Sequence, residues 1–203
     1  MNTKQKIAII APLVLLVVMV PIFQGLSRAF GGSVIGWYLG LVVYWLIWCI
    51  AFPLWIIGKE SIKTLIRPEK LTLKIFLLVL FPVVMASLYK LTLGMGYEKQ
   101  ALWTFLLLLT TPFGNGFFEE ILWRGVYMKL FPENILLRII WPSIGFALWH
   151  VAPGSVSSNT NVIGLVVGSG LMGFYLSFLA KKTKTIWWGV VAHTLGGLIM
   201  IVM

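Results

Sequence analysis

Two adjacent glutamates in an apolar stretch are the first sign of chemistry in this chain. Glu119 and Glu120 lie within FFEEILWRGVYMKL, at residues 117–130, and the whole protein has only six acidic residues. A carboxylate in a membrane-like environment costs about 3 kcal/mol or more unless it is paired or protonated. The pair therefore indicates a functional site.

The local spacing assigns different partners to the two carboxylates. Glu120 and Arg124 are four residues apart, so on a helix they can form an ion pair, whereas Glu119 is rotated away by about 100°. We predict that Glu120 organises the site and that Glu119 does the chemistry. The alternative is a helix cap or a salt-bridge network with Arg124 and Lys129, which accounts well for Glu120 and poorly for Glu119.

The two histidines of the chain, His150 and His193, also lie within or at the end of apolar runs. Singly, each is more typical of a hydrogen-bonded core residue, but with the glutamates they form a set of the kind that pairs inside a helix bundle. A carboxylate and an imidazole in a dry pocket can activate water, as a general base pair or as two metal ligands. The second imidazole could stabilise an oxyanion or add a ligand, and Phe146 could shield His150 from one turn away.

The elements that hold these residues are predicted to be membrane-spanning helices. Hydrophobic residues make up 60% of the 203 residues, and the mean hydropathy is +0.97, far above the soluble norm. Because about 20 apolar residues cross the hydrocarbon, the runs predict an all-α, polytopic membrane helix bundle with seven transmembrane helices. The predicted spans are Ile7 to Phe23, Val34 to Ile57, Ile75 to Tyr89, Leu102 to Phe118, Leu136 to Val151, Val162 to Ala180 and Thr185 to Val202.

The run TTPFGNG, at residues 110–116, breaks the helical pattern directly before Glu119. Pro and Gly at membrane depth are tolerated where neighbours or a water-filled cavity satisfy the freed backbone groups, so we expect a kink or a cavity beside Glu119. If the break separates the glutamate helix from the fourth span, the count becomes eight. The glycine-rich sixth span predicts close helix packing.

The net charge of +10 follows membrane topology and does not indicate a nucleic-acid partner. With a cytoplasmic N-terminus, seven spans leave only Arg28, Lys90 and Lys99 as basic residues outside. This predicts an integral membrane protein, bacterial by its compact chain, with its C-terminus outside. The basic segment Lys59 to Lys74 is expected to form a short surface helix that ends near Pro68.

The chain is predicted to be a single membrane domain over residues 1–203, because no soluble segment, long linker or repeat interrupts it. Within it, residues 1–100 form the first three spans, and residues 101–203 form a catalytic core with every candidate residue. The single cysteine, Cys49, is expected to pack inside the bundle.

Three short motifs in the second half of the chain resemble those of one known family. EEILWRG, from Glu119, resembles an EExxxR motif, and FALWH, ending at His150, an FxxxH motif. AHTLGG, around His193, resembles the third motif of the CAAX prenyl endopeptidase and bacteriocin-processing family, also called CPBP or Abi. The resemblance covers roughly Leu102 to the C-terminus.

This resemblance implies an intramembrane protease of mostly helical fold in which Glu119 and His150 activate water. Glu120 and Arg124 would organise the site, and His193 would stabilise the oxyanion or coordinate a metal. If zinc or another divalent metal takes part, its ligands would be Glu119, His150 and His193, although the histidines lack the HExxH spacing of many metalloproteases. A metal-free reaction is equally open.

One position departs from the family pattern. An Asn commonly follows the third-motif histidine by four residues, and here that position is Gly197. Loss of one oxyanion donor costs about 10² to 10³ in rate. Water or backbone could substitute at Gly197, Asn115 could contribute from elsewhere, or the protein could be slow or non-proteolytic.

The leading hypothesis is hydrolysis of a peptide bond in a membrane-associated or lipidated peptide, at a site that opens toward the cytoplasm. The implied partners are membrane lipid and a peptide or protein substrate, either prenylated or a secreted peptide precursor. The alternative is a catalytically weak or inactive protein that binds a peptide toxin and gives bacteriocin immunity. A proton-coupled transporter would also explain buried Glu and His, but seven spans without a repeat fit that class poorly.

Overall fold

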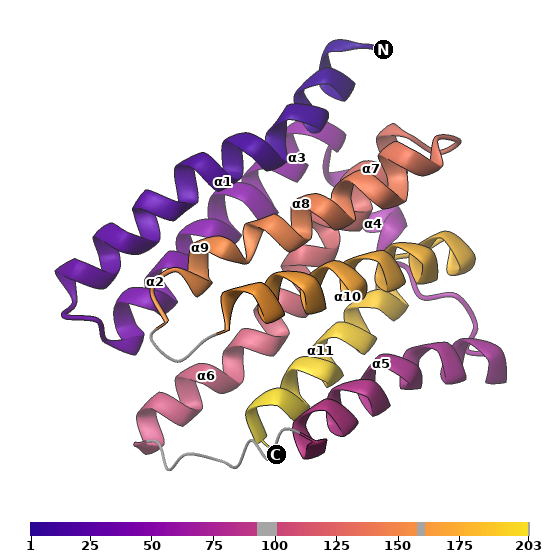
Figure 1. Ribbon diagram of the computed structural model, residues 1–203. Helices are drawn as coiled ribbons and strands as arrows, with labels where there is room; N and C mark the ends of the chain where they lie inside the picture. Colours follow the sequence, from indigo (N-terminus) through magenta and orange to yellow (C-terminus); the bar gives the residue numbers. More distant parts are fainter. Residues whose placement is uncertain (93–100, 158–160, 203) are drawn as a thin grey trace.

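The computed structural model describes residues 1–92, 101–157 and 161–202, and all regular structure in these ranges is helical (Figure 1). The predicted all-α class is therefore confirmed. The label η marks π-helix, in which each N–H bonds to the carbonyl five residues back. The elements are α1 (Thr3–Ala29), α2 (Val34–Tyr44), η1 (Trp45–Ala51), α3 (Phe52–Ile57), α4 (Lys59–Leu65), α5 (Leu73–Thr92), α6 (Leu102–Gly114), η2 (Asn115–Glu119), η3 (Ile121–Val126), α7 (Tyr127–Leu130), η4 (Leu136–Ile140), α8 (Trp141–Trp149), α9 (Val151–Gly154), α10 (Val162–Thr183) and α11 (Trp187–Val202).

Among the described residues, five helical segments are long and apolar enough to cross a membrane. They correspond to the first, second, third, fifth and sixth predicted spans. These segments are Thr3–Ala29, Val34–Ile57, Leu73–Thr92, Leu136–Gly154 and Val162–Thr183. The apolar helix at Trp187–Ile201 is shorter. Helix length and composition therefore do not establish the predicted total of seven or eight.

The glutamates lie within one continuous helical segment. Elements α6, η2, η3 and α7 follow one another from Leu102 to Leu130 without a non-helical residue, a length of about 43 Å at about 1.5 Å per residue. The helix passes through Pro112 into π-helical turns instead of ending, so of the two alternatives that the sequence left open, the glutamate helix continues the fourth span. A separate glutamate helix, on which the count of eight depended, is not found.

The glycines in this helix allow its neighbours to approach closely. A Cβ on Gly114 would lie 2.5 Å from the Trp45 ring, and a Cβ on Gly116 would overlap Thr194 Oγ1. Glycine therefore permits η1 and α11 to pack directly on the glutamate helix. In α10, a Cβ on Gly173 would lie 2.9 Å from an aromatic ring of α8, which confirms the close packing predicted for the glycine-rich span.

The core is aromatic, and the outer surface is apolar. Tyr44 and Trp149 stack with ring centroids 3.6 Å apart, and Trp123 Nε1–H donates to the Tyr44 hydroxyl at 2.8 Å. Large aliphatic side chains face outward, among them Val17, 73% exposed, and Ile163, 78% exposed. An apolar outer surface over a packed aromatic core is what lipid requires of an integral membrane protein.

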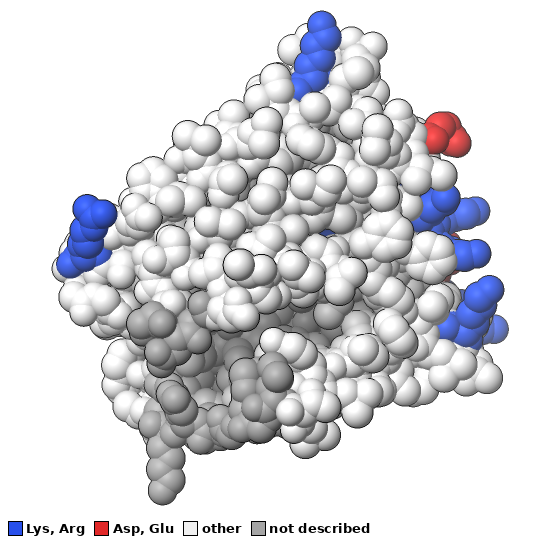
Figure 2. Space-filling view, viewed as in Figure 1, with Lys and Arg blue, Asp and Glu red and all other residues white. Residues whose placement is uncertain are grey.

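Basic side chains gather at one end of the bundle (Figure 2). Gln5 Nε2–H donates to the Leu130 carbonyl at 2.8 Å, and Ile186 N–H to the Leu65 carbonyl at 2.9 Å. The start of α1, the ends of α4 and α7 and the start of α11 therefore meet at this end, which we call the basic end. Helix α4 is the short helix predicted in the basic segment. The opposite end, where α1 leads into α2, carries Arg28.

Candidate active site

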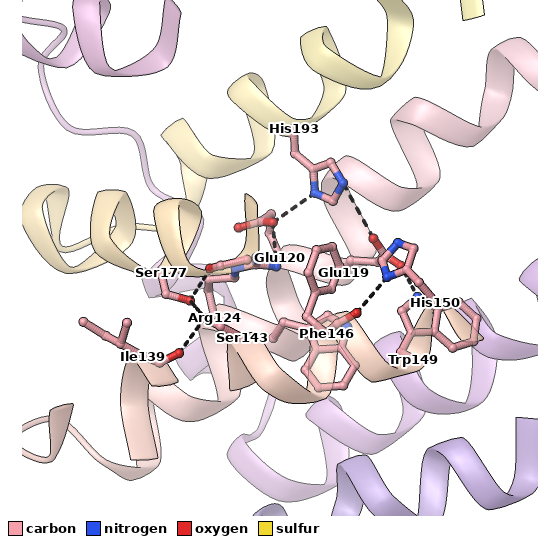
Figure 3. A network of polar contacts seen from close by, with 12 residues as sticks. Glu119, Glu120, Arg124, Ile139, Ser143, Phe146, Trp149, His150, Ser177 and His193 are labelled. Atoms are coloured by element: carbon pink, nitrogen blue, oxygen red, sulfur yellow. Dashed lines mark hydrogen bonds and ion pairs between the residues drawn. The ribbon is translucent and has the colours of Figure 1, made fainter. Parts of the chain in front are cut away.

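The five predicted site residues converge inside the bundle (Figure 3). Glu119 ends η2, Glu120 follows it directly, and Arg124 lies in η3. His150 follows the last residue of α8, and His193 lies in α11. The packing of α8 and α11 on the glutamate helix brings the two histidines to the glutamates.

Glu120 is the buried centre of the polar network. Its Oε1 lies 3.0 Å from Arg124 Nη1 and 3.0 Å from His193 Nδ1, and its side chain is 0% exposed. Arg124 also donates from Nη2 to the Gly173 carbonyl at 3.2 Å. The predicted pair with Arg124 is confirmed, and the same carboxylate fixes one ring nitrogen of His193. A Cβ on Gly189 would lie 2.7 Å from Glu120 Oε2, so glycine allows α11 to pass this close.

Glu119 is held by an indole instead of by Arg124. Its Oε1 accepts a hydrogen bond from Trp149 Nε1–H at 3.0 Å. Its Oε2 lies 3.7 Å from His193 Nε2 and has no hydrogen-bond partner among the described residues. Within the same residues neither glutamate pairs with Lys129, which disfavours the salt-bridge alternative. Because Glu119 is 1% exposed, Oε2 is a buried acceptor within reach of a proton from water or substrate.

His150 keeps one ring nitrogen for its own helix. Its Nδ1 lies 2.7 Å from the Phe146 carbonyl oxygen. A carbonyl only accepts, so Nδ1 carries the hydrogen and Nε2 is the nitrogen left for chemistry. The Phe146 ring meets the imidazole edge-on with centroids 4.8 Å apart, and the Arg124 guanidinium carbon lies 4.5 Å from the centre of that ring. The predicted shielding of His150 by Phe146 is confirmed.

A cavity of about 310 Å³ reaches Glu119 and His150. It confirms the cavity expected beside Glu119. The lining residues are Trp37, Leu41, Asn115, Glu119, Trp149, His150, Pro153, Gly154, Ser157 and Leu165. A larger hollow of about 640 Å³ between α5 and α10 has an apolar lining without any of the candidate residues.

Asn115 and Gly197 occupy different surroundings. Asn115 lines the cavity one helical turn before Glu119, and its Oδ1 accepts from Trp45 Nε1–H at 3.0 Å. A Cβ on Gly197 would lie 3.1 Å from the Pro112 Cβ. A larger side chain at Gly197 would therefore press on Pro112, which would have to give by a few tenths of an ångström, whereas the Asn115 amide is already oriented beside the cavity.

Several residues that hold the site were not predicted from the sequence. Trp149 supplies the hydrogen bond to Glu119, and Tyr44, from a distant helix, stacks on that indole. The position of Trp149 next to His150 was the only available signal. Gly173 and Gly189 accommodate Arg124 and Glu120, and only the tertiary structure assigns them that role.

A metal centre is not assembled by the described side chains. Within residues 1–92, 101–157 and 161–202, no three His, Cys, Asp or Glu side chains form a group that could hold an ion. His193 Nδ1 is engaged by Glu120, and His150 Nδ1 by its own helix. Both histidines therefore present Nε2, and an Nδ1 held in this way is found in histidines that orient water and in histidines that ligate a metal.

The comparison with known families agrees with this geometry. A helical membrane bundle with a buried carboxylate and imidazoles beside a cavity is an architecture suited to hydrolysis within the membrane. Residues 101–199, which contain all five site residues, match the family described as Type II CAAX prenyl endopeptidase Rce1-like. No curated protein and no solved structure matches the chain.

Proposed function

We propose that this protein is an intramembrane endopeptidase that hydrolyses a peptide bond of a membrane-associated or lipidated peptide. The observation that carries the proposal is the shared cavity wall of Glu119 and His150. A peptide carbonyl in that cavity would lie beside a buried carboxylate oxygen without a partner among the described residues and beside an imidazole of fixed orientation. The match of residues 101–199 to a protease family supports the same reaction.

In the proposed reaction, Glu119 Oε2 takes a proton from a water molecule that His150 Nε2 helps to orient. The water oxygen bonds to the carbonyl carbon of the scissile peptide, and the carbonyl electrons move to its oxygen. When the tetrahedral intermediate collapses, the C=O bond re-forms, the C–N bond breaks and the leaving nitrogen takes the proton from Glu119. Such general acid–base catalysis contributes about 10²- to 10⁴-fold in rate.

Two groups are proposed to stabilise the oxyanion of this intermediate. His193 donates Nδ1–H to Glu120, which is itself paired with Arg124, and its Nε2 faces Glu119 Oε2. As an imidazolium, His193 carries a second hydrogen on Nε2, which it would donate to the oxyanion. The Asn115 amide nitrogen is the second donor, because Trp45 holds the amide oxygen of Asn115 at the cavity wall. Asn115 would then replace the donor that Gly197 lacks.

The proposed reaction runs without a metal, and chelation tests this point separately. Purified protein treated with a strong chelator and then freed of it is expected to keep its cleavage rate and to contain less than one equivalent of zinc or other divalent metal by mass spectrometry. A rate that falls on chelation and returns with zinc would assign Glu119, His150 and His193 as ligands instead.

The proposed topology has seven spans, with the N-terminus in the cytoplasm and the C-terminus outside. Besides the five longer segments, the helix Leu102–Leu130 and α11 are proposed to cross the membrane. Support comes from the length of the first of these, from the apolar composition of the second and from the gathering of basic residues at one end.

The central experiment measures hydrolysis in heavy-oxygen water. The substrate is a pool of peptides with an apolar membrane anchor in detergent micelles, and mass spectrometry detects products. We expect cleavage that places one heavy oxygen in each new carboxylate and a loss of at least about 10²-fold in Glu119→Gln. The matched control is Glu133→Gln at an exposed glutamate, which should cleave normally. Unchanged cleavage by Glu119→Gln would refute the assignment.

The packing of Gly197 on Pro112 favours one second candidate, a peptide-binding immunity protein with a weak or inactive site. The family Asn would pack tightly against Pro112 of α6 there. On this alternative Glu119→Gln would protect a host from a peptide toxin as well as the unchanged protein does. If the protein is a protease, any protection from the toxin that it gives would be lost in Glu119→Gln.

A further inference from the structure

The cavity beside the candidate catalytic residues approaches one end of the bundle. Its outer wall consists of Trp37 near the start of α2, Pro153 in α9, Ser157 after α9 and Leu165 near the start of α10. These helix ends lie at the end opposite the basic one, because α1 runs from the basic end to the start of α2 (Figure 1).

The side of the site that faces the basic end is closely packed. Every residue of η3, Ile121–Val126, is buried. Arg124, 1% exposed, lies in this layer. Tyr127, the first residue after η3, donates its hydroxyl hydrogen to the Ala8 carbonyl at 2.8 Å. The cavity wall therefore continues away from the basic end, so the expected cytoplasmic opening and a cytoplasmic basic end do not hold together.

The distribution of charge indicates which end of the bundle faces the cytoplasm. Lys and Arg gather at the basic end, as Figure 2 shows, and basic segments stay in the cytoplasm. The opposite end, which the cavity approaches, is then the noncytoplasmic end.

We propose that substrate reaches Glu119 and His150 from the noncytoplasmic side of the membrane, as a short, extended, uncharged peptide segment. The proposal rests on the proposed peptidase function and adds the route and the class of peptide.

The size and the lining of the cavity define that class. A volume of about 310 Å³ is at the small end of the range for ligand sites, about 300 to 1,000 Å³, so it admits one or two side chains together with their backbone. The outer wall is formed by Trp37, Pro153 and Leu165, with Ser157 as its polar member, and carries no charge. A charged side chain would lose its hydration against this wall, and an acidic one would in addition face the Glu119 carboxylate without gaining a partner.

Cysteine labelling tests the route without any need for catalysis. The chain has a single native cysteine, Cys49, which is 0% exposed, so an added cysteine reports alone. We expect Leu165→Cys to react with a membrane-impermeant maleimide on intact cells. Val167→Cys, two residues on and 57% exposed on the apolar outer surface, should not react because lipid covers it. Lys182→Cys, exposed at the basic end, should react only after permeabilisation.

The labelling is interpreted for variants that size-exclusion chromatography has shown to be folded. Reaction of Leu165→Cys only after permeabilisation, or no reaction under either condition, would overturn the route. An uncharged apolar hexapeptide added outside should slow the labelling at least about fivefold, whereas the same peptide with a central Asp should not. Equal protection by both peptides would overturn the uncharged class.

Cleavage in sealed vesicles distinguishes this inference from the proposed function. Right-side-out vesicles should cleave an external, uncharged anchored peptide, and inverted vesicles should cleave it at least tenfold more slowly. Cleavage confined to inverted vesicles would refute the route and leave the peptidase function standing. No cleavage in either orientation or in detergent would refute the peptidase function, while the labelling would still decide the route.

Discussion

The two adjacent glutamates have different structural roles. Glu120 neutralises Arg124 and orients His193 from a fully buried position, while Glu119 accepts a hydrogen bond from Trp149 and lines the cavity. Helical spacing predicted this division, because only Glu120 is one turn from Arg124. It could not predict the indole of Trp149 on Glu119, since that contact depends on how α8 packs.

Removal of Glu120 should destabilise the protein more than neutralisation of Glu119. Glu120→Ala leaves the Arg124 charge buried without its partner, a loss of about 3 to 5 kcal/mol, whereas Glu119→Gln keeps an acceptor for Trp149. Thermal unfolding in detergent should therefore give a much lower Tm for Glu120→Ala and a nearly unchanged Tm for Glu119→Gln. The double variant Glu120→Ala with Arg124→Met should recover part of the loss. Equal Tm values for both single variants would contradict the assigned roles.

Asn115 should affect the rate of cleavage more than substrate binding. If its amide stabilises the oxyanion, Asn115→Ala lowers kcat by about 10²-fold or more and leaves KM nearly unchanged. Trp45→Phe removes only the hydrogen bond that orients the amide, so its kcat should lie between those of Asn115→Ala and the unchanged protein. An effect of Asn115→Ala on KM alone would assign this residue to binding.

At the scale of helices, hydropathy predicted most positions well, but it left the course of the glutamate helix open. The apolar runs located five spans, because a helix that crosses lipid has to be apolar along its whole length. The Pro and Gly residues before Glu119 left open whether the helix ends there, and in the structure it continues through π-helical turns. Sequence alone cannot distinguish a glycine that ends a helix from one that accommodates a neighbour, because the neighbour is distant in the chain.

The glycine contact between η2 and α11 should be sensitive to a single methyl group. Gly116→Ala places a Cβ against Thr194, next to His193, so α11 has to move and both Tm and cleavage should fall. Gly168→Ala in α10 is the matched control, because no atom lies within 4 Å of its added Cβ. Its Tm should stay the same or rise slightly, since alanine favours helix by about 1 kcal/mol over glycine. Equal behaviour of the two variants would show that the contact is not tight.

At the scale of the whole molecule, the charge pattern could be predicted from the sequence, but the direction of the cavity could not. Basic residues lie in short segments that can be counted along the chain, and they gather at one end in the structure. The cavity wall is assembled from the distant segments around Trp37, Asn115, His150 and Leu165. No linear pattern joins these segments, so the expectation of a cytoplasmic opening could be based only on the position of the glutamate helix.

The seven-span topology can be tested at the turn after the glutamate helix. If Leu102–Leu130 crosses the membrane, the exposed Glu133 lies in the cytoplasm and Arg28 lies outside. An impermeant maleimide should therefore label Arg28→Cys on intact cells and Glu133→Cys only after permeabilisation, and alkaline phosphatase fused after Met203 should be active. Labelling of Glu133→Cys on intact cells would mean that the glutamate helix does not cross. An inactive phosphatase would mean an even number of spans, and the cavity would then have to be assigned to a side by labelling alone.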